Sequence, residues 1–146
     1  MMENKKNLRV GIYLRLSNED RDKKEETSES IKNQRNMLYD YIKKNDNFIL
    51  TGEYCDEDIS GAGTYRPEFE RLIRDCEKRK LDIVLCKSQS RFSRDMEIIE
   101  KYIHNKFREW NIRFIGISDY ADTEILGNKK ARQINGLVNE WYLEDV

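Results

Sequence analysis

Residues 8–17 read Leu-Arg-Val-Gly-Ile-Tyr-Leu-Arg-Leu-Ser, and this stretch decides the fold class. Its apolar side chains recur at every second position, at Val10, Ile12, Leu14 and Leu16. A period of two is typical of a β-strand, because successive side chains of a strand point to opposite faces. We therefore predict a strand over residues 8–16 that ends at Ser17.

The rest of the chain alternates between helical and strand patterns. A charged stretch from Asn18 to about Glu29 is expected to be an exposed loop. Helices are expected over about residues 28–44, from Pro67 to Cys76, and over 93–109, with further strands over 48–54, 81–86 and 112–117. This order is typical of an α/β domain with a largely parallel sheet, whose site lies beyond the carboxyl ends of the strands.

The C-terminal residues 129–146 carry apolar side chains at helical spacing, at Ile134, Leu137, Val138, Trp141 and Tyr142. No stop signal follows them, and the last acidic residues have the wrong charge for a helix C-terminus. We interpret this segment as the start of a longer helix and expect the natural protein to continue. The expected division is a core over residues 1–128 and a helix start over 129–146.

The charge composition bears on whether the chain could bind DNA by itself. Charged residues make up 38% of the chain, but the formal net charge is −1. An autonomous DNA-binding domain is usually basic, so a DNA substrate would need a local basic cluster or another domain. The three cysteines are expected to be reduced thiols. Neither a transmembrane run nor a signal peptide is recognisable, so we expect a cytoplasmic protein without a membrane partner.

Three polar residues occupy alternate positions at the end of the first predicted strand. Tyr13, Arg15 and Ser17 follow at i, i+2 and i+4, so their side chains face the same side. A hydroxyl beside a guanidinium could be a nucleophile beside a phosphate clamp. The alternative is a polar strand end without a chemical role, which is common.

A second candidate feature is the basic segment over residues 87–94, which contains three cations and no acid. Arg91 and Arg94 are three residues apart, so both could project the same way at a helix start. The planar guanidinium binds phosphate oxygens in two places and stays charged. A solvated basic loop is the alternative.

Single residues elsewhere have two interpretations each. Gln34 lies on the apolar stripe of its helix and is either a site residue or a hydrogen-bonded core amide. Arg66 could add a phosphate contact or lie on the surface. His104, the only histidine, falls off the apolar stripe of its helix, so we assign it no catalytic role.

An acidic cluster, Asp56, Glu57 and Asp58, could hold Mg²⁺ through its oxygens. Nothing else in the chain completes a metal motif, so solvated loop acids are favoured. A metal-dependent nuclease or phosphoesterase that uses these acids remains an alternative function. A non-catalytic α/β binding domain is another, although it would give no reason for arginines to gather near Ser17.

Together these pieces resemble the serine recombinase family of resolvases, invertases and large serine integrases. The resemblance spans Arg9 to Val146 in the family's order. It is carried by Tyr13-Leu-Arg-Leu-Ser17, Ser30-Ile-Lys-Asn-Gln34-Arg-Asn-Met-Leu38, Asp58-Ile-Ser60-Gly61 with Arg66-Pro67, Ser90-Arg91-Phe-Ser-Arg94-Asp95, and Asn139-Glu140-Trp141-Tyr142. The last motif is similar to the interface helix of large serine recombinases.

The resemblance implies a three-layer α/β domain with a mainly parallel central sheet of about four to five strands, flanked by helices, and the start of a long interface helix. It implies that Ser17 attacks a DNA phosphodiester, forming a 5′-phosphoserine bond, and that rejoining needs no ATP. Neither a cofactor nor a metal is expected. The residues implied for the site are Tyr13, Arg15, Ser17, Gln34, Arg66, Arg91 and Arg94.

The resemblance also implies partners. These are double-stranded DNA and, in the full-length protein of a mobile element such as a transposon, a homodimer or homotetramer. Two positions depart from the family pattern. Ser90 stands where many relatives have aspartate, and Asp58 stands where large relatives often have glycine. The sequence does not identify the general base.

Overall fold

The computed structural model describes residues 6–16, 24–57, 66–125 and 137, with the side chains of the first helix described from residue 31 on. Its sheet has five strands in the order β2-β1-β3-β4-β5. The strands are β1 Leu8–Arg15, β2 Phe48–Asp56, β3 Ile83–Cys86, β4 Arg113–Gly116 and β5 Ala121–Asp122. The first four strands are parallel, and β5 runs antiparallel to β4.

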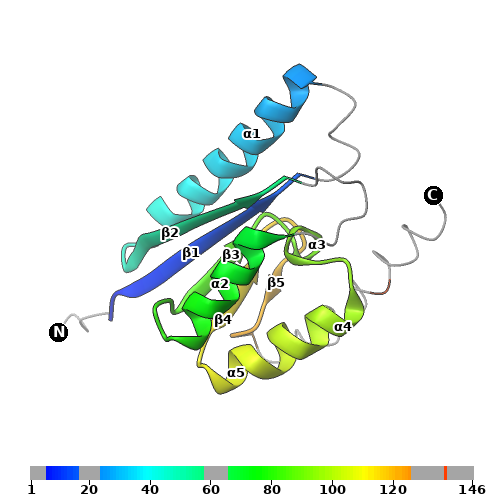
Figure 1. Cartoon of the computed structure of the whole chain (residues 1–146). Coiled ribbons are helices and arrows are strands. Elements are labelled where there is room, and N and C mark those ends of the chain that lie inside the picture. The colour runs from blue at the N-terminus through cyan, green and yellow to red at the C-terminus, as the bar shows by residue number, and fades with distance from the viewer. Residues whose placement is uncertain (1–5, 17–23, 58–65, 126–136, 138–146) are drawn as a thin grey trace.

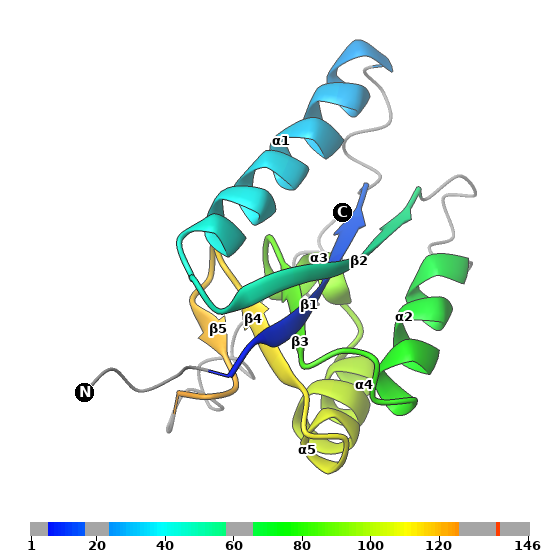
Figure 2. The ribbon, with the colours of Figure 1, turned by 90° about the vertical axis from the view of Figure 1, so that its left-hand side faces the viewer.

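Helices cover both faces of the sheet, so the fold has three layers. Figure 2 shows α1 on one side of the sheet and α2, α4 and α5 on the other. The helices are α1 Lys24–Lys43, α2 Pro67–Glu77, α3 Gln89–Phe92, α4 Met96–Ile98, the π-helix η2 Ile99–Lys106, and α5 Phe107–Glu109. The predicted α/β class with a mainly parallel sheet is confirmed (Figure 1).

Strand β1 joins the two halves of the core. Val10, Ile12 and Leu14 are fully buried in the cluster beneath α1, whereas Tyr13 lies in the cluster beneath α2 and η2. This is the predicted alternation, and both faces are apolar because helices cover each of them. The carboxyl end of β1 is therefore held from both sides.

The strand boundaries differ from the prediction by one or two residues, and the helices differ mainly in three places. Helix α1 begins at Lys24, inside the stretch predicted to be a loop, because glutamate and lysine are good helix formers. The helix expected from residue 93 begins at Met96, where Asp95 accepts a hydrogen bond from the Glu97 amide at 2.9 Å. The segment before it, expected to be a loop, contains the short helix α3.

His104 is buried, with 4% of its surface exposed, so its predicted place off the apolar stripe is wrong. In an α-helix, positions five residues apart lie on different faces. The i→i+5 hydrogen bonds of η2 bring His104 onto the buried face with Ile99. Its Nδ1 atom lies 2.9 Å from a carboxylate oxygen of Glu100.

Other sequence predictions concern the cysteines and membranes. Cys55, Cys76 and Cys86 are free thiols, as predicted. Among the residues that the structure describes, no helix is long and apolar enough to cross a membrane. Apart from Leu137, the segment 129–146 lies outside the described residues, so the division at residue 128 stays a prediction.

Truncation of a β1 core residue should be costly. Leu14→Ala is expected to lower the free energy of unfolding by about 2–5 kcal/mol, because it opens a cavity between two packed layers. Leu50→Ala on neighbouring β2 is the matched control, since 41% of Leu50 is exposed, and should cost less than about 1 kcal/mol. Urea unfolding followed by circular dichroism measures both, and equal losses would contradict this account of the core.

Candidate active site

The carboxyl ends of β1, β2 and β3 meet at one edge of the sheet, as parallel strands require. Arg15 ends β1, Asp56 ends β2, and the basic segment 87–94 follows β3. Ser17 lies just beyond the described residues, as do Asp58, Ser60 and Gly61. The described part of the site consists of the side chains that surround the end of β1.

Arg15 and Arg91 are joined by reciprocal hydrogen bonds. The Nε atom of Arg15 donates to the backbone oxygen of Arg91 at 3.2 Å, and its Nη2 atom donates to the backbone oxygen of Ser90. In return, Nη1 of Arg91 donates to the backbone oxygen of Arg15 at 2.9 Å. The last residue of β1 and the helix α3 are thus tied together by two arginines that the sequence placed in separate motifs.

Arg66 reaches the same region from the start of α2. Its Nη1 atom donates to the backbone oxygen of Phe92 and lies 3.5 Å from the hydroxyl of Tyr13. Its guanidinium carbon sits 3.9 Å from the centre of the Phe69 ring, which is a cation–π distance. Arg66 is therefore held in the cluster and is not an isolated surface arginine.

The cluster concentrates positive charge. Burial, together with the like charges of Arg66, Arg91 and Arg94, lowers the pKa of Arg15 to about 10, while Tyr13 acts in the opposite direction. Hydrogen bonds tie Arg15 and Arg66 to α3 and tie Arg91 to the end of β1, and Arg94 acts on Arg15 through its charge. Arg15 still carries its charge near neutral pH, so the arrangement favours the arrival of an anion.

Gln34 supports the end of β1 from the opposite layer. It lies on α1, only 1% of its surface is exposed, and its Nε2 atom donates to the backbone oxygen of Arg15 at 3.3 Å. Among the described residues its Oε1 atom has no hydrogen-bond partner. Gln34 and Arg91 therefore converge on one carbonyl, two residues before Ser17.

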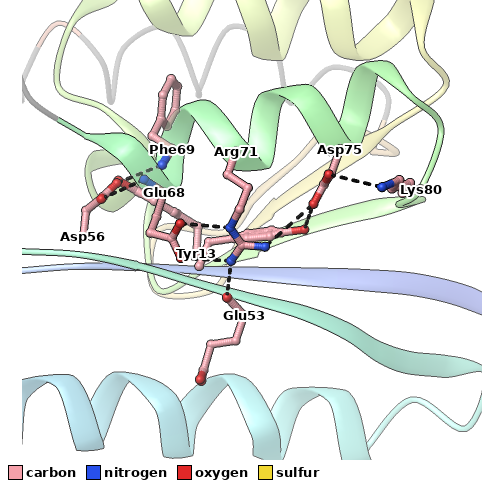
Figure 3. Close-up of polar contacts among 9 residues, drawn as sticks. Tyr13, Glu53, Asp56, Glu68, Phe69, Arg71, Asp75 and Lys80 are labelled. Atoms are coloured by element: carbon pink, nitrogen blue, oxygen red, sulfur yellow. Dashed lines mark hydrogen bonds and ion pairs between the residues drawn. The ribbon is translucent and has the colours of Figure 1, made fainter.

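Asp56 is the site residue whose place the sequence did not reveal. It is 4% exposed, so the prediction of a solvated loop acid is wrong for this member of the acidic cluster. Tyr13 donates its hydroxyl proton to Oδ2 at 2.8 Å, and the amides of Glu68 and Phe69 donate to the carboxylate at 3.0 and 2.9 Å (Figure 3). Asp56 thereby satisfies amides at the start of α2 that have no partner within the helix.

A signal for this role existed in the sequence. Pro67 marks the first position of a helix, because its missing N–H needs no partner there, and α2 begins at Pro67 as predicted. The next two amides need acceptors, and Asp56 at the end of β2 is the carboxylate that supplies them. Glu57, by contrast, is exposed.

Tyr13 connects Asp56 to the arginines. Burial, together with the nearby Asp56 carboxylate, raises the pKa of the Tyr13 phenol far above its usual range, against the opposing effect of Arg66. The group therefore stays protonated and donates to Asp56. The Tyr13 hydroxyl thus links Asp56 to Arg66.

A second set of contacts fixes α2 against β2. Arg71 donates to the backbone oxygen of Glu53 at 3.0 Å, and its guanidinium carbon lies 4.1 Å from the centre of the Tyr54 ring. The Tyr54 hydroxyl donates to Asp75 at 2.6 Å. Figure 3 shows Arg71 and Asp75 along the helix, beyond Asp56 at its start, with the hydrogen bond from Arg71 to Glu53. The start of α2, and with it Arg66, is thus held at several points.

Residues 10–145 match the family model described as the N-terminal domain of resolvase. No curated protein matches the chain. The N-terminal catalytic domain of TP901-1 integrase has a similar structure, with a TM-score of 0.69 and 29% identity over 93% of this chain and 97% of that one.

Two further solved structures share the fold. A resolvase-family site-specific recombinase from Streptococcus pneumoniae matches with a TM-score of 0.70 and 22% identity, covering 95% of this chain and 90% of that one. The C-terminal catalytic domain of ISC1926 TnpA, an IS607-like serine recombinase, matches with a TM-score of 0.60 and 24% identity, covering 77% and 71%.

Asp56 should matter for stability far more than its neighbour. Asp56→Ala is expected to lower the free energy of unfolding by about 2–4 kcal/mol, because it leaves the helix amides and the buried Tyr13 hydroxyl without an acceptor. Glu57→Ala is the control and should change stability by less than about 0.5 kcal/mol. Urea unfolding measures both, and an undiminished stability of Asp56→Ala would show that these hydrogen bonds are dispensable.

Proposed function

The chain belongs to the resolvase family of serine recombinases as a catalytic domain, and we propose that Ser17 is the nucleophile with which it cuts DNA. The family match confirms the resemblance that the five sequence motifs indicated. In the proposed reaction, the phosphoryl group of a DNA phosphodiester is transferred from the 3′ oxygen to the serine oxygen. A site-specific recombination follows when the DNA ends are exchanged and rejoined.

The proposed step balances as a transesterification. The Ser17 hydroxyl loses its proton as its oxygen attacks phosphorus, and the bond between phosphorus and the 3′ oxygen breaks. The leaving oxygen takes up a proton and becomes a 3′-hydroxyl, while the 5′ phosphate stays on the serine. Rejoining reverses these steps with another 3′-hydroxyl, so the energy of the phosphoester bond is kept and no ATP is consumed.

One observation carries this proposal: the arginines gather where β1 ends. Arg15 precedes Ser17 by two residues, and strand alternation would bring Ser17 to the face that already presents Tyr13 and Arg15. The contacts of Arg15 with Arg91, and the electrostatic influence of Arg66 and Arg94 on it, support one shared anion site.

The four arginines are proposed to act on the phosphate. Arg15, Arg66, Arg91 and Arg94 are proposed to bind the non-bridging oxygens and to stabilise the charge that develops in the transition state. Fixed donors are effective there because they need no rearrangement as the charge appears. Gln34 and Tyr13 are proposed to position this set, Gln34 through the carbonyl of Arg15 and Tyr13 through Asp56.

The proposed partner is double-stranded DNA. With a formal net charge of −1, the chain can neutralise few phosphates, so its own affinity for duplex DNA is expected to be weak and salt-sensitive. We propose that other regions of the full-length recombinase, acting as a homodimer or homotetramer, supply the affinity and the choice of site.

The metal-dependent nuclease is less well supported. Both oxygens of Asp56 already accept hydrogen bonds from Tyr13 and from the start of α2. Within residues 6–16, 24–57 and 66–125, no group of three potential ligands is placed to hold a metal ion. The arginines would supply the positive charge that a metal supplies in such nucleases.

Replacement of Ser17 tests the nucleophile. In the full-length protein, incubated with its DNA site in the presence of a chelator, Ser17→Ala should abolish cleavage and the covalent protein–DNA adduct while DNA binding persists. Ser118→Ala, an exposed serine after β4, is the control and should form the adduct normally. Mass spectrometry of the adduct locates the modified residue. An adduct on another residue, or wild-type cleavage that requires a metal, would overturn the proposal.

A conservative arginine replacement tests the phosphate clamp. Arg91→Lys keeps the charge but loses the planar fork, so cleavage is expected to slow by about 10²-fold or more. Arg108→Lys on the exposed surface of α5 should cleave at the wild-type rate. Single-turnover cleavage at saturating DNA measures the chemical step, and near-normal cleavage by Arg91→Lys would place this residue outside the clamp.

A further inference from the structure

Asp119 lies three residues after β4 and contacts the helix that carries Arg91. Its Oδ2 atom accepts a hydrogen bond from the backbone amide of Gln89 at 3.0 Å, and Gln89, the first residue of α3, is fully buried. Its Oδ1 atom is also buried. Burial raises the pKa of this carboxyl group, and backbone hydrogen bonds from the amides of Gln89, Asp119 and Ala121 oppose that effect. The carboxylate is therefore part of the framework beneath α3.

The last residue of β4 makes room for this contact. A Cβ atom at Gly116 would lie 2.7 Å from Oδ1 of Asp119 and 3.0 Å from the backbone nitrogen of Gln89. The first distance is too short for a real Cβ contact and the second is unusually tight, so Gly116 allows the carboxylate and the start of α3 to approach the strand. Two separate positions of the sequence thus serve the same contact.

Helix α3 presents its carbonyl groups to the catalytic arginines. The backbone oxygens of Ser90 and Arg91 accept hydrogen bonds from Arg15, and that of Phe92 accepts one from Arg66. The helix is only four residues long, and so short a helix has little stability of its own. Its position must therefore come from contacts with the rest of the fold.

Two such contacts hold the ends of α3. At the far end, the fully buried Phe92 ring packs edge-on against Phe69, Phe107 and Phe114. At the near end, the Gln89 amide is bound by Asp119. A shift at the near end would move the carbonyls that orient Arg15, and displacement of a catalytic group by about 1 Å can cost about 10²-fold in rate.

We propose that Asp119 is a positioning residue for DNA cleavage, which holds α3 through the Gln89 amide and thereby orients Arg15 and Arg66 toward the phosphate. The proposal rests on the proposed function for its effect on the reaction. Its structural part does not depend on cleavage, because the orientation of Arg15 and the binding of inorganic phosphate can be measured on the chain itself.

The test compares Asp119→Ala with Asp82→Ala. Asp82 is the matched control, because its carboxylate also accepts a backbone amide hydrogen bond, from Arg9 at 2.8 Å, but at the opposite end of the sheet. Asp119→Ala should shift the NMR signal of the Arg15 Nε–H group, weaken inorganic phosphate binding about tenfold or more, and slow cleavage of saturating DNA by at least as much. Asp82→Ala should change none of the three.

A conservative variant separates positioning from general loss of structure. Asp119→Asn keeps an oxygen that can accept the Gln89 amide, so it should cleave within about threefold of the wild type. If Asp119→Ala does not fold, Gly116→Ala replaces it, because the added methyl group disturbs the same contact. Wild-type phosphate binding and cleavage by the folded variant, or equal losses in Asp82→Ala, would overturn the proposal.

Failure of the proposed function gives a different result. If the wild-type chain bound no phosphate and formed no DNA adduct, the anion site itself would be wrong. The Arg15 signal would still decide the positioning role: a shift in Asp119→Ala but not in Asp82→Ala supports it, and an unchanged signal in both refutes it.

Discussion

Backbone carbonyl oxygens hold the guanidinium groups on which the site depends. Arg15, Arg66 and Arg91 each donate to a carbonyl of the strand end or of α3. A carbonyl carries only a partial charge, so it fixes a guanidinium without cancelling its positive charge. A carboxylate in the same place would bind more tightly and would compete with a phosphate. These carbonyl contacts order the guanidinium groups without adding a full negative charge, which fits the proposed anion site.

The surrounding fold is organised to supply those carbonyls. The end of β1 is fixed by Gln34 from one layer and by Tyr13 and Asp56 from the other, so the Arg15 carbonyl and side chain come from a rigid strand. Two carboxylates near the site, Asp56 and Asp119, bind backbone amides. Asp56 binds the start of α2, and Asp119 binds the start of α3. Asp56 and Asp119 thus hold the start of α2, next to Arg66, and the start of α3, which contains Arg91.

Local patterns allowed much of this to be predicted. The alternation in residues 8–16 predicted β1, and Pro67 predicted the start of α2. The phosphate clamp inferred from the spacing of Arg91 and Arg94 stays a prediction. Pro67 indicated that amides at the start of α2 need acceptors, but no local pattern identified Asp56 as the acceptor or paired Asp119 with Gln89, because each carboxylate binds an amide at least twelve residues away. His104 was misplaced because a π-helix changes the periodicity on which the apolar stripe was drawn. Ser17 stays a prediction from motif and strand register.

The crowding of like charges around Arg15 links the stability of the folded chain to its ligand. The folded chain bears the cost of burying that guanidinium beside three other cations, and the unfolded chain does not. An anion that binds only the folded form raises the free energy of unfolding. Once the anion concentration exceeds the dissociation constant, this increase grows with the logarithm of the ratio of the two. A DNA phosphate bound in the cluster would therefore raise the stability of the folded domain, so that substrate binding and folding would be thermodynamically linked.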